Sequence, residues 1–161
     1  MYFNFQFSIY LTMKRLKFLL IIPLMLLTVT CSNAQPKGDG EVILLNKADF
    51  LTKVFNYEEQ TEEWKYKGKK PCIIDFYADW CGPCKLIAPI MQELAAEYKD
   101  EIIFYKIDTD VEQELAAVFG ISSIPLVLYV PMDGQPQAAL GARPKEDMVE
   151  IINSILLDKE K

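Results

Sequence analysis

Residues 72–85 read CIIDFYADWCGPCK. The first half is an apolar run interrupted by one acid, Asp75, and it is typical of a buried strand. In the second half two residues separate Cys81 from Cys84, and a helical pattern begins directly afterwards at Leu86. At the first turn of a helix this spacing leaves the sulfurs about one turn apart, close enough to form a disulfide. We therefore predict a redox-active cysteine pair at the start of a helix.

The two cysteines are expected to differ in role. Cys81 stands at the exposed N-terminal end of the predicted helix, where unpaired N–H groups and the helix dipole favour the thiolate that attacks disulfides. Cys84 lies one turn further in, and we expect it to be the shielded, resolving thiol. Because zinc and iron–sulfur sites usually take four ligands and the sequence has no histidine, we predict no metal and no bound cofactor.

Several short motifs after the cysteine pair match one family in order and rough spacing. They are Lys106-Ile107-Asp108, Phe119-Gly120-Ile121, Ile124-Pro125 and Gly141. Together with residues 73–85 they make residues 41–157 resemble the thioredoxins. The resemblance implies an α/β thioredoxin fold in a single domain, with a central mixed five-stranded sheet flanked by about four helices.

The resemblance also implies catalytic roles. Asp75 would lie beneath the disulfide with a raised pKa and act as general base for Cys84, while the ammonium of Lys106 on the next strand would interact with that acid. From the residues alone, Asp75 could equally be a strand-end acid satisfied by backbone or water, and Lys106 a surface lysine. Pro125 would be cis and pack against the cysteines, and the backbone of Ile124 would bind an extended substrate segment.

An apolar surface around the sulfurs is expected to receive the substrate. The resemblance places Trp80, Gly82, Pro83, Ile121 and Gly141 on it, although Trp80 could also be only a packing residue. Leu126 departs from the threonine common in the family, which implies a shifted specificity. The Gly-Pro pair between the cysteines and the isoleucine at 124 resemble reducing members, so we predict a protein-disulfide reductase. The alternatives are an oxidase or isomerase that uses the same residues in the opposite direction, and a non-catalytic binding or metal-carrying module.

Residues 1–34 have the pattern of a signal peptide. Three basic residues precede the apolar stretch 18–29, which at about a dozen residues is too short to cross a bilayer comfortably. The true start could be Met13. The signal would end either by cleavage after Ala34 or by lipidation of Cys31, and lipidation would anchor the protein to a membrane.

The rest of the chain is predicted to be a linker over 35–40 and a thioredoxin domain over 41–161. Without residues 1–34 the chain carries 14 basic and 23 acidic residues, a formal net charge of −9 that makes nucleic acid an improbable partner. Export would place it in the periplasm of a Gram-negative bacterium, as a soluble or lipid-anchored monomer. Its partners there would be disulfide-containing exported proteins and a membrane thiol-transfer protein that supplies electrons.

Hydrophobic periodicity predicts the order of the elements. Strands are expected at 42–45, 72–77, 102–107, 126–130 and 138–140, and helices at 47–55, 85–98, 112–119 and 145–157. Residues 131–137 should form the turn between two antiparallel strands, and the charged stretch 58–70 a solvated loop. Pro89 should kink the second helix. We expect Cys72 to be a small buried hydrophobe rather than a regulatory thiol.

Overall fold

The computed structural model describes residues 40–59 and 63–158. In this part of the chain the strands are β1 (Val42–Leu44), β2 (Cys72–Tyr77), β3 (Ile103–Asp108), β4 (Leu126–Val130) and β5 (Gln137–Leu140). The helices are α2 (Lys47–Lys53), α3 (Gly82–Glu97), α4 (Gln113–Val118) and α5 (Lys145–Ile151), and α5 continues into the π-helical segment η2 (Ile152–Leu156). The predicted signal peptide, the possible start at Met13 and the possible lipidation site at Cys31 lie outside the described residues.

The strands of the described residues form one mixed sheet in the order β1-β3-β2-β4-β5. Strands β1, β3 and β2 are parallel, whereas β4 runs antiparallel to β2 and β5 antiparallel to β4. The predicted fold class, a single α/β domain around a mixed five-stranded sheet with four helices, is confirmed. Strand β2 occupies the middle of the sheet, and the chain leaves it directly into the cysteine motif.

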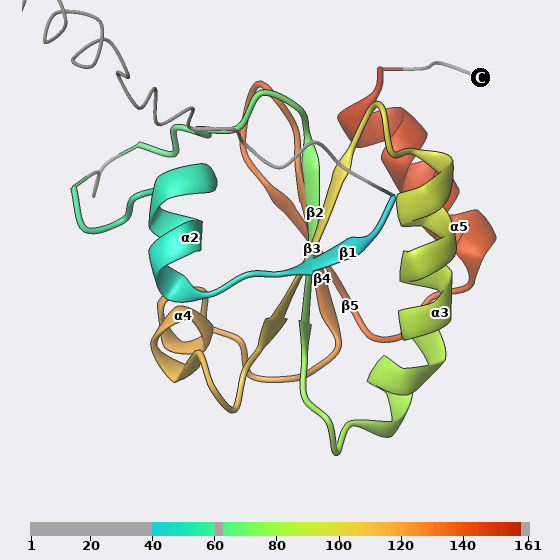
Figure 1. Ribbon diagram of the computed structural model, residues 1–161, viewed down its shortest axis with the longest axis horizontal. Coiled ribbons are helices and arrows are strands. Elements are labelled where there is room, and N and C mark those ends of the chain that lie inside the picture. The colour runs from blue at the N-terminus through green and yellow to red at the C-terminus, as the bar shows by residue number, and fades with distance from the viewer. Residues whose placement is uncertain (1–39, 60–62, 159–161) are drawn as a thin grey trace, which may run out of the picture. The chain divides into compact units, whose positions relative to one another are not determined.

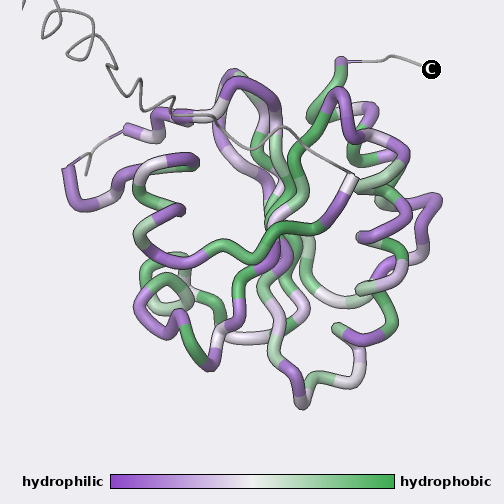
Figure 2. The backbone as a smooth tube through the Cα atoms, viewed as in Figure 1, coloured by the Kyte–Doolittle hydropathy of each residue, from purple (hydrophilic) through white to green (hydrophobic). Residues whose placement is uncertain are grey.

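Helices cover both faces of the sheet. Figure 1 shows α2 and α4 against one face and α3 and α5 against the other. Each face has its own core: Phe50, Val54 and Leu115 pack on the α2/α4 side, and Ile87 and Met148 on the α3/α5 side. Hydrophobic positions accordingly gather along the central strands, with polar positions on the outer helices and loops (Figure 2).

The helix that carries the cysteines begins earlier than its apolar pattern predicts. It starts at Gly82 rather than at Lys85, because the Cys81 sulfur caps the helix by accepting a hydrogen bond from the Cys84 N–H at 3.1 Å. Pro83 fits the first turn, where its missing N–H is not needed. The apolar periodicity shows only the packed part of a helix, so it gave a start three residues too late.

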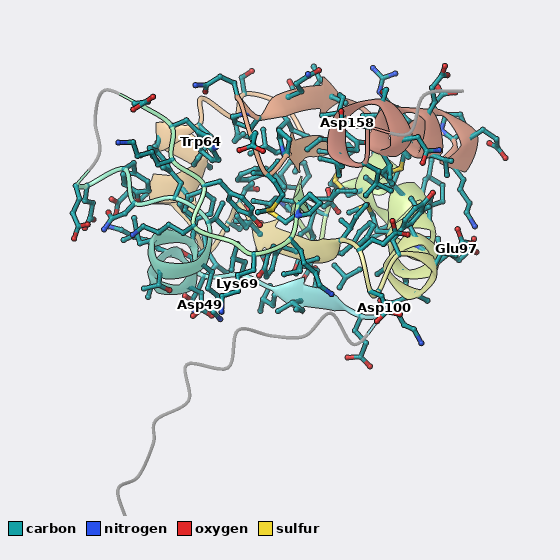
Figure 3. All side chains as sticks on the ribbon, turned by 90° about the horizontal axis from the view of Figure 1, so that it is seen from above. Asp49, Trp64, Lys69, Glu97, Asp100 and Asp158 are labelled. Carbon is teal, nitrogen blue, oxygen red and sulfur yellow. A yellow bond between two sulfur atoms is a disulfide. The ribbon has the colours of Figure 1, made fainter. Side chains whose placement is uncertain are left out.

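The segment between α2 and β2 is more than the solvated loop predicted for residues 58–70. Lys65, Lys67 and Lys69 are exposed as expected, but Trp64 and Tyr66 alternate with them and pack against the core on the α2/α4 side. The Trp64 ring lies 4.4 Å from that of Phe55 between ring centroids. Figure 3 shows Trp64 at this end of the molecule, away from Glu97 and Asp158.

Candidate active site

The cysteine pair lies where β2 ends and α3 begins. Cys81 and Cys84 form a disulfide, with their Cα atoms 5.3 Å apart. Both residues are only 3% exposed, and they form a small cluster with Ala78 against which Tyr77 and Ile124 pack. Cys81 therefore lies at the helix end as predicted, but in the disulfide form it is no more exposed than Cys84, because neighbouring apolar groups cover it.

Asp75 lies within the central strand and is 5% exposed. Burial raises its pKa from 3.8 to about 7, and the positive charge of Lys106 opposes this rise without cancelling it. Its Oδ1 atom has no hydrogen-bond partner among the described residues. No described backbone group therefore satisfies this oxygen atom, and Asp75 lies inside β2 and not at its end. A carboxyl group that titrates near neutral pH can both take up and release a proton under ordinary conditions.

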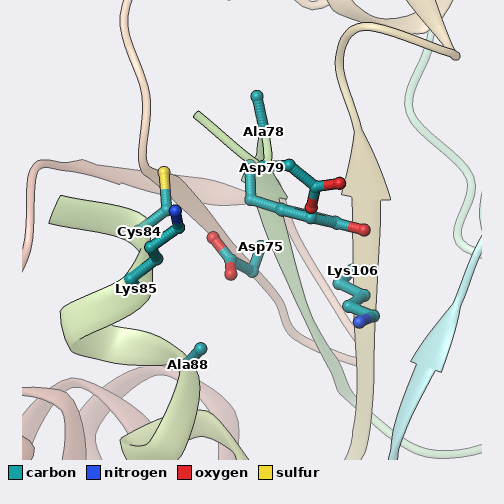
Figure 4. Close-up of a pocket in the computed structure, with 8 residues that line it drawn as sticks. Asp75, Ala78, Asp79, Cys84, Lys85, Ala88 and Lys106 are labelled. Atoms are coloured by element: carbon teal, nitrogen blue, oxygen red, sulfur yellow. The ribbon is translucent and has the colours of Figure 1, made fainter. Parts of the chain in front are cut away.

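A pocket of about 220 Å³ joins this acid to the cysteine pair. Figure 4 shows Asp75 between α3, which carries Cys84 and Lys85, and β3, which carries Lys106. The other lining residues are Tyr77, Ala78, Asp79 and Ala88. Cys84 and the buried acid Asp75 therefore share one cavity, which is the arrangement that proton transfer between them would require.

Lys106 is aligned with Asp75 in the parallel β2–β3 register. Its Nζ lies 5.2 Å from the centre of the Tyr77 ring, and among the described residues it makes no ion pair within 4.0 Å. The expected interaction with Asp75 is therefore an electrostatic one across the pocket and not a direct contact. Lys106 also lines the pocket, so it is not merely a surface lysine.

The loop before β4 contacts the cysteine cluster through Ile124. The Ile124–Pro125 peptide bond is cis, and Ile124 packs against the cysteine cluster. The Pro125 carbonyl accepts a hydrogen bond from the Gly141 N–H at 2.8 Å, which ties the start of β4 to the end of β5. Gly141 has a φ of +86°, a conformation that favours glycine.

Trp80, Gly82 and Pro83 form the outer surface beside the disulfide. Trp80 is 70% exposed, so it is not a packing residue, and its Nε1 donates a hydrogen bond of 2.9 Å to Asp110. Gly82 and Pro83 are also exposed. Ile121 is half-buried and packs against the core on the α2/α4 side, as Ile124 also does.

Four polar residues of the site were not predicted: Tyr77, Asp79 and Lys85 in the pocket, and Asp110, which accepts the hydrogen bond from Trp80. The first three are close to the cysteine motif in sequence, which is the signal that could have found them. Cys72, by contrast, is fully buried, and burial raises its pKa to about 12, so its thiol stays protonated.

In the described residues no group of three or more His, Cys, Asp or Glu side chains could hold a metal ion. No helix among them is both long and apolar enough to cross a membrane.

The Thioredoxin family model matches residues 45–154 of the chain. The chain belongs to the thioredoxin family. A thioredoxin from Borreliella burgdorferi is 44% identical over 110 residues, which cover 68% of this chain and 93% of the relative. One from Haemophilus influenzae is 36% identical over 114 residues, covering 71% of this chain and 96% of the relative.

Solved structures of thioredoxins share the fold. Chloroplastic thioredoxin z superposes with a TM-score of 0.60 at 23% identity, covering 71% of this chain and 93% of that one. The thioredoxin of Halobacterium salinarum gives 0.57 at 25% identity, covering 72% and 91%. As a member of this family the protein is a thiol–disulfide oxidoreductase, and Cys81 and Cys84 are its exchanging pair.

Proposed function

We propose that this thioredoxin reduces disulfides in exported proteins. The thiolate of Cys81 attacks one sulfur of a client disulfide, and the other client sulfur leaves as a thiolate that takes up a proton. The Cys84 thiol then gives its proton to Asp75, and the resulting thiolate attacks the sulfur of Cys81. The second client thiolate is released and protonated, so the client gains two electrons and two protons while Cys81 and Cys84 become a disulfide.

One observation carries this mechanism: a carboxyl group with a pKa of about 7 shares a pocket with the resolving cysteine. An ordinary aspartate would be too weak a base to deprotonate a thiol, whose pKa is about 8.5 in water. Burial raises the pKa of Asp75 to about 7 and so makes it a stronger base than the free side chain. The pKa of Asp75 therefore comes close to that of the thiol because Asp75 lies in the buried middle strand.

Client binding is proposed to use the surface beside the disulfide. Trp80, Gly82 and Pro83 are exposed there, and Ile124 packs against the cysteines just before the cis proline. The backbone of Ile124 would hold an extended client segment, with the client disulfide over Cys81. The exposed Trp80 ring supplies apolar contact area at this place.

The reduction potential of the Cys81–Cys84 pair tests the direction of exchange. We expect about −270 mV when the protein is equilibrated with thiol buffers, the range of reducing thioredoxins. Pro83→His is the matched control, since a cationic ring beside Cys81 would stabilise its thiolate and raise the potential. A wild-type value above about −180 mV would instead make the protein a disulfide donor or isomerase.

Export is proposed from the signal-peptide pattern of residues 1–34. In the periplasm the reduced pair would be restored by a membrane thiol-transfer protein. Residues 1–34 fused to a reporter enzyme that is active only outside the cytoplasm should give activity, whereas a fusion lacking residues 13–34 should not. Mass spectrometry of the mature protein distinguishes cleavage after Ala34 from lipidation at Cys31, and Cys31→Ser would release only a lipidated form. Reporter activity equal in both fusions would refute export.

A further inference from the structure

We propose that Tyr77 is a positioning residue, which holds the ammonium of Lys106 and thereby sets the proton affinity of Asp75. This rests on the proposed role of Asp75 as the base for Cys84. The three side chains come from neighbouring strands and line the same pocket. Tyr77 itself transfers neither electrons nor protons in this mechanism.

The register of the sheet brings the three groups together. Asp75 pairs with Lys106, and Tyr77, two residues further along β2, pairs with Asp108. Because side chains two residues apart on a strand share a face, Asp75, Tyr77 and Lys106 all lie on the side that α3 covers. An aromatic ring is therefore placed beside the acid, within reach of the lysine that faces this acid.

The position of the ammonium indicates what the ring does. Lys106 Nζ lies 5.2 Å from the centre of the Tyr77 ring, within the distance at which a cation is attracted to an aromatic face. It has no carboxylate within 4.0 Å among the described residues. The Tyr77 ring is thus the contact that holds the Lys106 ammonium in place. From this position the positive charge lowers the pKa of Asp75 but does not cancel the effect of burial.

Two carboxylates besides Asp75 are available to the ammonium: Asp79 lines the same pocket, and Asp108 pairs with Tyr77 in the β2–β3 register. Burial raises the pKa of Tyr77, and the negative charges of Asp108, Asp79 and Asp75 raise it further. Asp79 is exposed and Asp108 half-buried. Without the aromatic face, we expect the ammonium to move toward these more hydrated carboxylates and away from Asp75. The pKa of Asp75 would then rise toward the value that it has with no lysine at all.

Other ionisable groups lie around Asp75 and must be held constant in a test. Besides Lys106 and Tyr77 they are Cys84 and Lys85 from α3 and Asp79 from the loop after β2, which line the pocket, and Tyr129 from β4, whose pKa the charge of Asp75 raises. In the oxidised protein the cysteines do not titrate. The pKa of Asp75 in that form therefore reports the surroundings of the acid, independently of the direction in which the enzyme exchanges disulfides.

A double-mutant cycle on the oxidised protein tests the inference, with the Asp75 carboxyl carbon followed by NMR as a function of pH. Lys106→Met should raise the pKa of Asp75 in the wild-type background, and the rise should be reduced by about half or more in the Tyr77→Leu background, since the two sites are coupled. Tyr77→Phe keeps the ring face and should preserve the full rise. An equal rise in all three backgrounds would show that Tyr77 does not act through Lys106.

A second measurement uses only the wild-type protein and does not depend on the folding of a variant. In the wild-type protein the ε-CH₂ protons of Lys106 should be shifted upfield by the Tyr77 ring, relative to those of an exposed lysine such as Lys69. Ordinary lysine shifts at Lys106 would overturn the inference. If instead both measurements succeed but Asp75→Asn leaves turnover intact, the positioning by Tyr77 stands and the proposed role of Asp75 fails.

Discussion

The burial of Asp75, more than any charged neighbour, determines how this residue titrates. A carboxyl group in the middle strand loses most of its hydration, and Lys106 restores only part of the lost stabilisation of its charged form. The same burial therefore brings the pKa of the proposed base Asp75 near neutral and makes the protein with a charged Asp75 less stable. Two predictions separate these effects.

Asp75→Asn should slow the reduction of a client disulfide by about tenfold to a hundredfold, because the Cys84 thiol loses its proton acceptor. The wild-type pH–rate profile should show an inflection near pH 7 from Asp75, and the variant should lack it. Lys106→Met serves as the control, since removal of the positive charge should move the inflection to higher pH rather than abolish it. Identical profiles for wild type and Asp75→Asn would contradict the role.

The free energy of unfolding should also depend on pH through this residue. A carboxyl whose pKa rises from 3.8 to about 7 on folding binds a proton in the native state over that window, so stability falls as pH increases through it. Asp75→Asn removes this dependence. Urea unfolding of the oxidised protein should therefore show the variant gaining up to about 4 kcal/mol relative to wild type between pH 4 and pH 8. A stability difference that stays constant with pH would exclude the raised pKa.

The sequence predicts some site residues and misses others for a physical reason. Cys81 and Cys84 are visible from their spacing, and Asp75 from its place in an apolar run. The contact of Tyr77 with Lys106 and that of Asp110 with Trp80 are not visible, because the partners come from different strands or loops: Asp110 and Trp80 are 30 positions apart in the chain. Local spacing contains no information about which distant residue the fold will bring beside a given side chain.

At the scale of elements, the bounds of two buried strands were predicted better than the bounds of the helices. Strands β2 and β4 have the predicted bounds, because apolar runs mark a buried strand along its whole length. Helix α3 begins three residues early, and α5 ends at Ile151 with a π-helical segment following it. Capping and backbone hydrogen bonds determine where a helix begins and ends, and the hydrophobic periodicity does not report either of them.

The segment between α2 and β2 should contribute to stability through Trp64. Its ring packs on Phe55 and lies 6.5 Å from that of Phe119 between centroids, which connects the segment to the end of α4. Trp64→Ala should lower the free energy of unfolding by about 2 to 3 kcal/mol, somewhat less than for a fully buried tryptophan. Urea unfolding measures this difference.

Trp80→Ala is the matched control for that experiment, because Trp80 is 70% exposed and its loss removes little packing. It should leave the free energy of unfolding within about 0.5 kcal/mol of wild type, although it should weaken client reduction. Equal destabilisation by the two substitutions would mean that the segment containing Trp64 is not part of the packed core.

At the scale of the whole molecule, the fold gives the two cysteines unequal surroundings although both are buried in the disulfide. Cys81 caps α3 with its sulfur, whereas Cys84 lies in the first turn and lines the Asp75 pocket. The sulfur of Cys81 is thus placed at the helix end, where a thiolate is stabilised, and Cys84 lies beside the pocket that holds the Asp75 carboxyl group. This asymmetry predicts a fixed order of attack.

Cys84→Ser should therefore accumulate a mixed disulfide between Cys81 and a client, because attack still occurs and resolution does not. With the reduced variant and an excess of a peptide disulfide, mass spectrometry should find one peptide bound covalently to Cys81. Cys81→Ser is the control, and it should trap little peptide because Cys84 lies in the first turn of α3 beside the Asp75 pocket and not at the helix end, where a thiolate is stabilised. Cys72 is fully buried and should remain unmodified in both variants. Equal trapping by Cys81→Ser would show that the fold does not distinguish the two sulfurs, and would reverse the roles assigned to them here.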